Sequence, residues 1–139
     1  MDIAPRNTGS FTSDNKVWVY ADISKQAGRR PVTLHVPAFT KATHYPDGYI
    51  RSGVPLGKIT SGANAGKYGP FDPEATDGRD EFDGWLWNFA DIEDGQLVAV
   101  QAIWDGPGTV WPEKLPLGAP DDDLKASVAD HGRFKFFSA

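Results

Sequence analysis

Hydrophobic and polar positions alternate strictly in the segment VTLHV, residues 32–36, which places its three aliphatic side chains on one face of an extended strand. Residues 96–104, QLVAVQAIW, are nearly continuous in apolar side chains and contain no Gly or Pro, which predicts a central strand. Near the C-terminus, Phe134 and Phe136 alternate with polar neighbours. This last pattern predicts a final strand that docks on the core.

One segment has a helical pattern instead, between Asp121 and Gly132. Asp121 is a suitable N-cap, Leu124 and Val128 fall four residues apart on one face, and Gly132 can end the helix. The 15 Gly and 11 Pro residues are spread along the 139-residue chain, which favours many short strands joined by turns. The sequence therefore predicts a mainly β fold, a small compact sandwich or barrel-like domain with one short C-terminal helix.

The first 15 residues differ from the rest of the chain. Their sizeable apolar side chains are few, Ile3 and Phe11, and Ser, Thr, Asn, Gly and Pro surround them. Such a segment buries too little surface to offset its ordering entropy. We expect residues 1–15 to form a flexible arm that orders on a partner through Ile3, Pro5 and Phe11, and residues 16–139 to form a single domain.

The overall charge narrows the range of partners. The formal net charge is −5 and the sequence pI is about 5.0, so the field of the chain repels phosphate and disfavours direct nucleic-acid binding. There is no Cys, which excludes disulfides and thiolate chemistry. No apolar run is long enough to cross a membrane, and the first residues do not resemble a signal peptide, so we expect a soluble protein.

Catalytic and metal chemistry are weakly indicated. The acids of the segment TDGRDEFDG (Asp77, Asp80, Glu81 and Asp83) lack the spacing of a calcium loop, and the sequence favours their being solvated turn residues. His35, His44 and His131 lie far apart and show no paired ligand spacing. No Ser lies in a nucleophile-elbow motif. We therefore expect no enzyme activity, no catalytic residue, no metal and no cofactor.

Tryptophan is abundant, at five residues. Such side chains dominate protein cores and interfaces, and they also form stacking platforms for sugars. Trp85 and Trp87 are expected on the same face of one strand. Trp85, Trp87, Trp111 and Pro112 are candidates for an interface between copies of the chain; a carbohydrate-binding module that uses Trp85, Trp87 or Trp111 is the alternative.

The central segment carries a family resemblance. Residues 53–60, GVPLGKIT, and 67–78, KYGPFDPEATDG, are similar in order and spacing to the G-x-x-L-G-K-I-T and K-Y-x-P-Y-D-P-x-A-x-D-G signatures of the lambda-type head decoration proteins of tailed phages, especially those of actinobacteria. The similarity extends loosely over residues 31–137. The matching turn residues are Gly57, Lys58, Tyr68, Pro70, Asp72, Pro73, Asp77 and Gly78. Two departures are a longer loop at residues 61–69 and the acidic, aromatic run at residues 79–89.

The resemblance implies a capsid protein without chemistry. It implies a β-rich domain that trimerises at the three-fold and quasi-three-fold positions of the expanded capsid, on the outer surface of the virion, and stabilises the major capsid protein lattice against the pressure of packaged DNA. The expected partners are the major capsid protein and further copies of the chain. In this interpretation the stretch rich in Gly, Pro and Asp that begins at Gly57 is a connection between strands. Its glycines, Gly57 and Gly69 among them, allow tight bends, and its prolines stiffen the chain.

Overall fold

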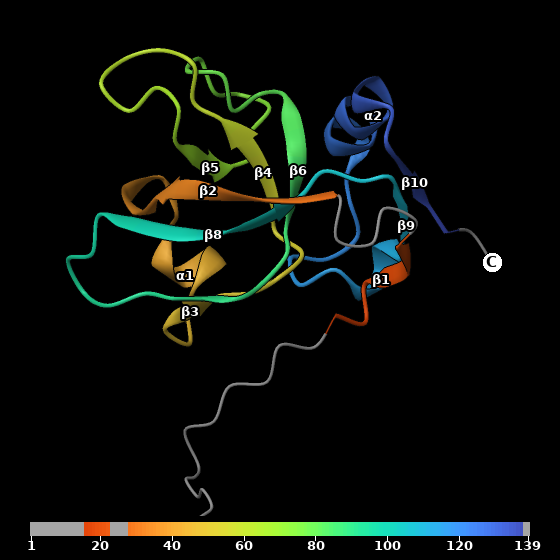
Figure 1. The fold of residues 1–139 in the computed structure, drawn as a ribbon, viewed down its shortest axis with the longest axis horizontal. Helices are drawn as coiled ribbons and strands as arrows, with labels where there is room; N and C mark the ends of the chain where they lie inside the picture. The colour runs from red at the N-terminus through yellow and green to blue at the C-terminus, as the bar shows by residue number, and fades with distance from the viewer. Residues whose placement is uncertain (1–15, 23–27, 138–139) are drawn as a thin grey trace, which may run out of the picture.

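The computed structural model describes residues 16–22 and 28–137. The predicted arm, with Ile3, Pro5 and Phe11, lies outside the described residues. Within them the chain forms short strands and one helix longer than a single turn (Figure 1). In chain order, the elements are β1 Val19–Asp22, β2 Arg29–His35, α1 Lys41–His44, β3 Tyr49–Ile50, β4 Pro55–Lys58, β5 Tyr68–Pro70, β6 Phe82–Leu86, β7 Ala90–Asp91, β8 Val98–Trp104, β9 Gly108–Val110, α2 Asp122–His131 and β10 Phe134–Phe136.

Five of the strands close into a barrel in the order β2-β5-β4-β6-β8. Strand β8 pairs with β2 over seven residue pairs, from Arg29 opposite Trp104 to His35 opposite Val98, and its C-terminal end also pairs with β6. Because only the C-terminal end of β8 has a paired strand on each side, the prediction of a central strand at residues 96–104 is confirmed for that end. The predicted strand at 32–36 is β2, whose aliphatic side chains point into the barrel.

A second sheet, in the order β1-β9-β10, lies beside the barrel, and β3 and β7 form a two-stranded ribbon. In Figure 1 the second sheet and α2 lie together on the same side of the barrel. Strand β10 is the predicted C-terminal strand, and it pairs parallel to β9. The mainly β fold with a short C-terminal helix is confirmed, and the barrel is its central unit.

The core has two parts on opposite sides of the barrel wall. Aliphatic side chains fill the barrel, and aromatic side chains fill the layer between the barrel wall, the second sheet and α2. Strand β6 contributes to both parts, because Leu86 points into the barrel and Trp85 points into the aromatic layer, and both are fully buried. A strand buried on both faces explains the density of large apolar residues there.

Helix α2 follows the sequence prediction closely. The Asp121 carboxylate accepts a hydrogen bond from the Leu124 amide at 2.9 Å, and Gly132 ends the helix in the left-handed conformation. Leu124 and Val128 are buried in the aromatic layer. The Phe82 amide donates a hydrogen bond to Ser127 Oγ at 2.8 Å, which ties the helix to β6.

Candidate interaction surfaces

The residues that carry the family resemblance form the framework of the barrel. Strands β4 and β5 are paired so that Gly57 lies opposite Gly69 and Lys58 opposite Tyr68. The backbone of Arg79 crosses directly over them: a Cβ at Gly57 would lie 2.7 Å from the Arg79 carbonyl oxygen, and one at Gly69 would lie 2.7 Å from Arg79 Cδ. We expected both glycines to permit bends, but they lie in strands, where they permit this close crossing.

The acids of the same motif fold the loop back onto the strands. The Asp77 carbonyl accepts a hydrogen bond from the Thr60 amide at 2.7 Å, and the Asp77 carboxylate accepts from Arg79 Nε at 3.1 Å. The Asp72 carboxylate accepts from the Glu74 amide at 2.9 Å, and the Asp72 amide donates to the Arg79 carbonyl at 3.0 Å. Burial acts to raise the pKa of Asp77, but hydrogen bonds from Arg79 and its charge outweigh burial and hold this pKa below its ordinary value. These two acids therefore have structural roles.

A polar network lies around the hydroxyl of the buried Tyr68 of β5. The Tyr68 hydroxyl donates to Asp83 at 2.7 Å and accepts from Arg30 at 3.1 Å. Arg30 also forms ion pairs with Asp83, at 3.2 Å, and with Asp105, at 2.8 Å. Burial, together with the hydrogen bond to Asp83, raises the pKa of Tyr68 above its ordinary value. Asp83, one of the acids expected to be solvated, therefore links β6 to β5 and β2.

The tryptophans divide between the core and the surface. Trp85 is 0% exposed, and its ring centroid lies 6.0 Å from that of Trp18 and 4.9 Å from that of Phe82. The suggestion that Trp85 lies at an interface or on a sugar platform is therefore wrong, because its own chain covers it. Trp87 shares the same side of the chain, as expected, since its ring also meets Trp18, at 6.1 Å.

The surface of Trp87 is largely covered by cations. The Arg29 guanidinium lies 3.8 Å from the centre of the Trp87 ring, and Lys16 Nζ lies 5.1 Å from it. Such cation–π contacts occupy the ring face that a sugar would need. Trp87 is half-buried, so it offers little area to a partner.

Trp111 contributes to a surface cluster that we call the aromatic patch, formed by Tyr20, Trp111 and Phe137. The rings of Tyr20 and Phe137 stack at 4.0 Å, and the Trp111 ring meets that of Phe137 edge-on at 5.6 Å. Tyr20 is 52% exposed. Pro112 begins a 3-10 turn beside Trp111, and Lys114 Nζ lies 5.4 Å from the centre of the Trp111 ring. Trp111 and Pro112 thus remain at the surface.

A second exposed surface lies on the barrel and was not predicted. We call it the β8 face; it consists of Val98 and Val100 of β8 with Pro31 and Thr33 of β2. Val98 and Val100 are 45% and 66% exposed, and Val100 lies opposite Thr33 in the β2–β8 pairing. At its edge, Pro31, Thr33 and Val100 line a hollow of about 430 Å³ together with Arg30, which is paired with Asp83 and Asp105, and with the cation Lys58. The apolar run at 96–104 predicted the strand, but three of its nine residues are exposed.

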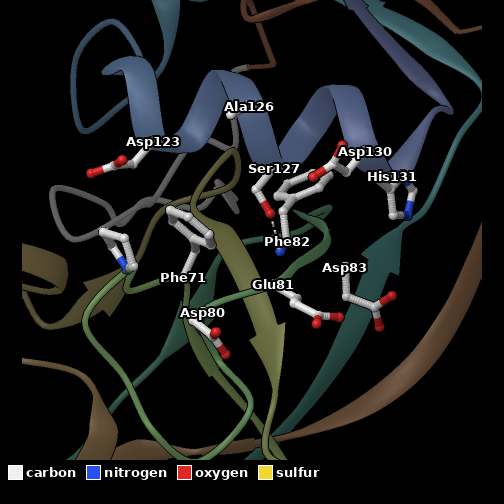
Figure 2. Close-up of a pocket in the computed structure, with 11 residues that line it drawn as sticks. Phe71, Asp80, Glu81, Phe82, Asp83, Asp123, Ala126, Ser127, Asp130 and His131 are labelled. Atoms are coloured by element: carbon white, nitrogen blue, oxygen red, sulfur yellow. Dashed lines mark hydrogen bonds between the residues drawn. The ribbon is translucent and has the colours of Figure 1, made fainter.

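A third surface is an acidic groove between α2 and the start of β6, with a volume of about 560 Å³ (Figure 2). Asp123 and Asp130 project from the helix, and Asp80, Glu81 and Asp83 lie along the opposite wall. The rings of Phe71 and Phe82 lie between the two walls. The groove also adjoins an apolar pocket of about 190 Å³, to which Leu115 and Leu117 contribute, and the two hollows share Phe71 and Pro73.

The groove contains Ser127 and His131, which raises the question of hydrolase chemistry. Ser127 Oγ accepts from the Phe82 amide, and the His131 ring stacks on Phe134 at 5.7 Å. Burial lowers the pKa of His131 below its ordinary value. In residues 16–22 and 28–137 no hydrogen bond joins Ser127 to His131, so this geometry lacks the pairing of nucleophile and base that such catalysis uses.

The histidines do not gather into a metal site. His35 lies on β2, His44 ends α1 and His131 ends α2. Among the described residues no three His, Cys, Asp or Glu side chains are grouped so that they could hold a metal ion. No helix in the described part of the chain is long and apolar enough to cross a membrane.

Comparison with known proteins found no matching family model, no matching curated protein and no matching solved structure.

Proposed function

We propose that this chain is a head decoration protein, which binds the outer surface of an expanded phage capsid as a trimer at three-fold and quasi-three-fold positions. By contacting the major capsid protein, it stabilises the lattice against the pressure of packaged DNA. The β8 face is the observation that supports a protein partner most directly. Its two valine side chains, Val98 and Val100, are 45% and 66% exposed in a domain whose other large apolar residues are mostly buried.

A capsid clamp of this kind needs two surfaces, one for copies of itself and one for the shell. The β8 face and the aromatic patch are two separate apolar surfaces on different sheets, because β8 belongs to the barrel and the patch lies on the sheet β1-β9-β10. Exposed apolar clusters of this kind are typical of protein contacts. The arm at residues 1–15 is proposed as a further shell contact, through strand addition anchored by Ile3, Pro5 and Phe11.

Co-sedimentation with expanded capsids that lack the protein tests this proposal. The full chain is compared with a chain that starts at Lys16, and both are titrated to saturation. We expect saturable binding that weakens sharply without the arm, since three arms on one trimer bind with avidity. Binding that survives truncation would assign the shell contact to the folded domain, and a full chain that never sediments with capsids would exclude decoration.

The carbohydrate-binding alternative has less support. It requires a bare aromatic face, whereas Trp85 is buried, Trp87 is covered by Arg29 and Lys16, and Lys114 lies over Trp111. Titration with host cell-wall glycans, followed by tryptophan fluorescence, tests it directly. A saturable shift that disappears in Trp111→Ala would favour this alternative over capsid decoration.

A further inference from the structure

We propose that copies of this chain associate head to tail, with the β8 face of one copy seated in the acidic groove of the next. The inference rests on the proposed trimer and identifies the two surfaces that form its seam. It also makes the acidic groove a protein-binding site whose ligand is a second copy of the same chain.

Charge complementarity is the first argument. Asp80, Glu81, Asp123 and Asp130 form no ion pair within the described residues, so the groove has an uncompensated negative charge. Lys58, at the edge of the β8 face, is exposed and likewise forms no ion pair in the described part of the chain. Each surface therefore presents the charge that the other lacks, which favours their association and disfavours like-with-like pairing.

Both surfaces also contain apolar side chains. Val98 and Val100 are 45% and 66% exposed, and the half-buried Phe71 ring lines the groove of about 560 Å³. The adjoining pocket of about 190 Å³ extends this apolar surface toward Leu117. Projecting aliphatic side chains in such a hollow, with charges around them, reproduce the usual arrangement of an apolar interface core and a polar rim.

Symmetry distinguishes this arrangement from a face-to-face contact. A cyclic trimer is built from one heterologous interface, in which two different surfaces meet, whereas a two-fold dimer pairs a surface with itself. Two β8 faces packed together would place Lys58 near the same cation of the second copy, and the groove acids would stay uncompensated. The head-to-tail contact avoids both costs.

The positions of the two surfaces on one chain fit a small ring. Lys58 lines both the hollow beside the β8 face and a smaller hollow that it shares with Glu81 and Asp83, and these two acids in turn line the groove. The surfaces are therefore neighbours, separated by a ridge at Lys58 and Asp83. In a three-membered ring, each copy fills a wedge whose two contact surfaces adjoin near the axis.

This assignment moves the seam away from Trp111 and Pro112. The aromatic patch lies on the sheet β1-β9-β10 and lines neither the groove nor the hollow beside the β8 face. The patch is then left for the capsid shell. The trimer contact and the shell contact would thus use different residues, which makes them separable by mutation.

The first test uses the full chain and measures its oligomeric state by sedimentation velocity over a range of concentrations. Val100→Asp places an acid in the β8 face, and the double variant Asp123→Lys with Asp130→Lys reverses the charge of the helix side of the groove. We expect each to raise the trimer dissociation constant at least about tenfold. Val17→Asp and Asp91→Lys, which make the same substitutions at exposed positions outside both surfaces, should leave it unchanged.

Mixing the variants tests the head-to-tail geometry itself. Val100→Asp retains an intact groove and the Asp123→Lys/Asp130→Lys variant retains an intact β8 face, so an equal mixture should form heterodimers that neither variant forms alone. A face-to-face contact predicts no such heterodimer. Circular dichroism of each variant confirms that it is folded, and Lys58→Glu added to the double groove variant should recover part of the lost association.

The outcomes separate this inference from the proposed function. A wild-type chain that is monomeric at all concentrations, or a Val100→Asp variant that trimerises like wild type, overturns the seam. If such a chain still binds expanded capsids, decoration stands without this seam. If the charge and mixing results are as expected but the trimer never sediments with capsids, the seam stands and the decoration function is wrong.

Discussion

Substitution of Gly57 by Ala tests whether the family-like motif acts as a framework. A Cβ at Gly57 would lie 2.7 Å from the Arg79 carbonyl oxygen and 2.8 Å from Arg79 Cα, both of which are backbone atoms. Arg79 is itself held, because its carbonyl accepts from the Asp72 amide and its side chain pairs with Asp77. The loop cannot move away from the new methyl group without breaking some of these bonds.

The magnitude follows from two contributions. Overpacking by one methyl group against a fixed neighbour destabilises by about 1–3 kcal/mol. Breaking one of the loop hydrogen bonds adds about 1 kcal/mol. We therefore expect Gly57→Ala to lower the free energy of unfolding by about 2–4 kcal/mol, which corresponds to a decrease in Tm of about 10 °C for a domain of this size.

A second variant at the same crossing serves as the control. At Gly69 the nearest atom to a new Cβ is Arg79 Cδ, a side-chain atom that can be removed. In an Arg79→Ala background, the cost of Gly69→Ala should therefore decrease, while the cost of Gly57→Ala should persist. Urea unfolding of wild type, the three single variants and the two double variants measures this. A Gly57→Ala protein as stable as wild type, or one rescued by Arg79→Ala, would refute the framework argument.

Four further results are expected. Tyr68→Phe should lower the free energy of unfolding by about 1–3 kcal/mol in urea titrations, because Asp83 and Arg30 each lose a partner. Asp121→Ala removes the N-cap of α2 and should lower the free energy of unfolding by about 1 kcal/mol in the same assay. Burial lowers the pKa of His131 and of His44 below the ordinary value of 6.5. Each histidine therefore contributes stability at pH values above 6.5, and this contribution is lost as the pH falls below 6.5. His131→Gln should flatten the decrease in unfolding free energy measured between about pH 7 and pH 5.5. Trp111→Ala should weaken capsid co-sedimentation while sedimentation velocity shows an unchanged trimer.

Local signals in the sequence were sufficient where the structure depends on neighbouring residues. Helix α2 begins and ends at the residues that its capping pattern indicated, because a cap is a contact within one turn. The strand at 32–36 was recognised from its alternation, since period 2 with one buried face leaves one interpretation. Both predictions needed no knowledge of which segments lie beside them.

Burial of a given aromatic side chain could not be predicted in this way. Trp85, Trp87 and Trp111 are equally hydrophobic in the sequence, yet one is fully buried, one is covered by two cations and one lies in a surface patch. These outcomes depend on the second sheet and α2, which come from distant parts of the chain. The exposure of Val98 and Val100 has the same origin, because no element of the described chain covers that part of β8.

The motif and the proposed interfaces overlap only in part, at residues such as Lys58, Phe71 and Pro73, and this limits what a resemblance can predict. Gly57, Gly69 and Asp77 hold the loop against the barrel, so they determine the fold whatever partner the protein binds. The β8 face and the helix side of the groove lie outside the matched segments, and Lys58 is a motif residue at their edge. Two chains with the same motif can therefore share a barrel and bind different shells. Contact between copies and with the capsid must be tested at Val100, Asp123 and Trp111 directly.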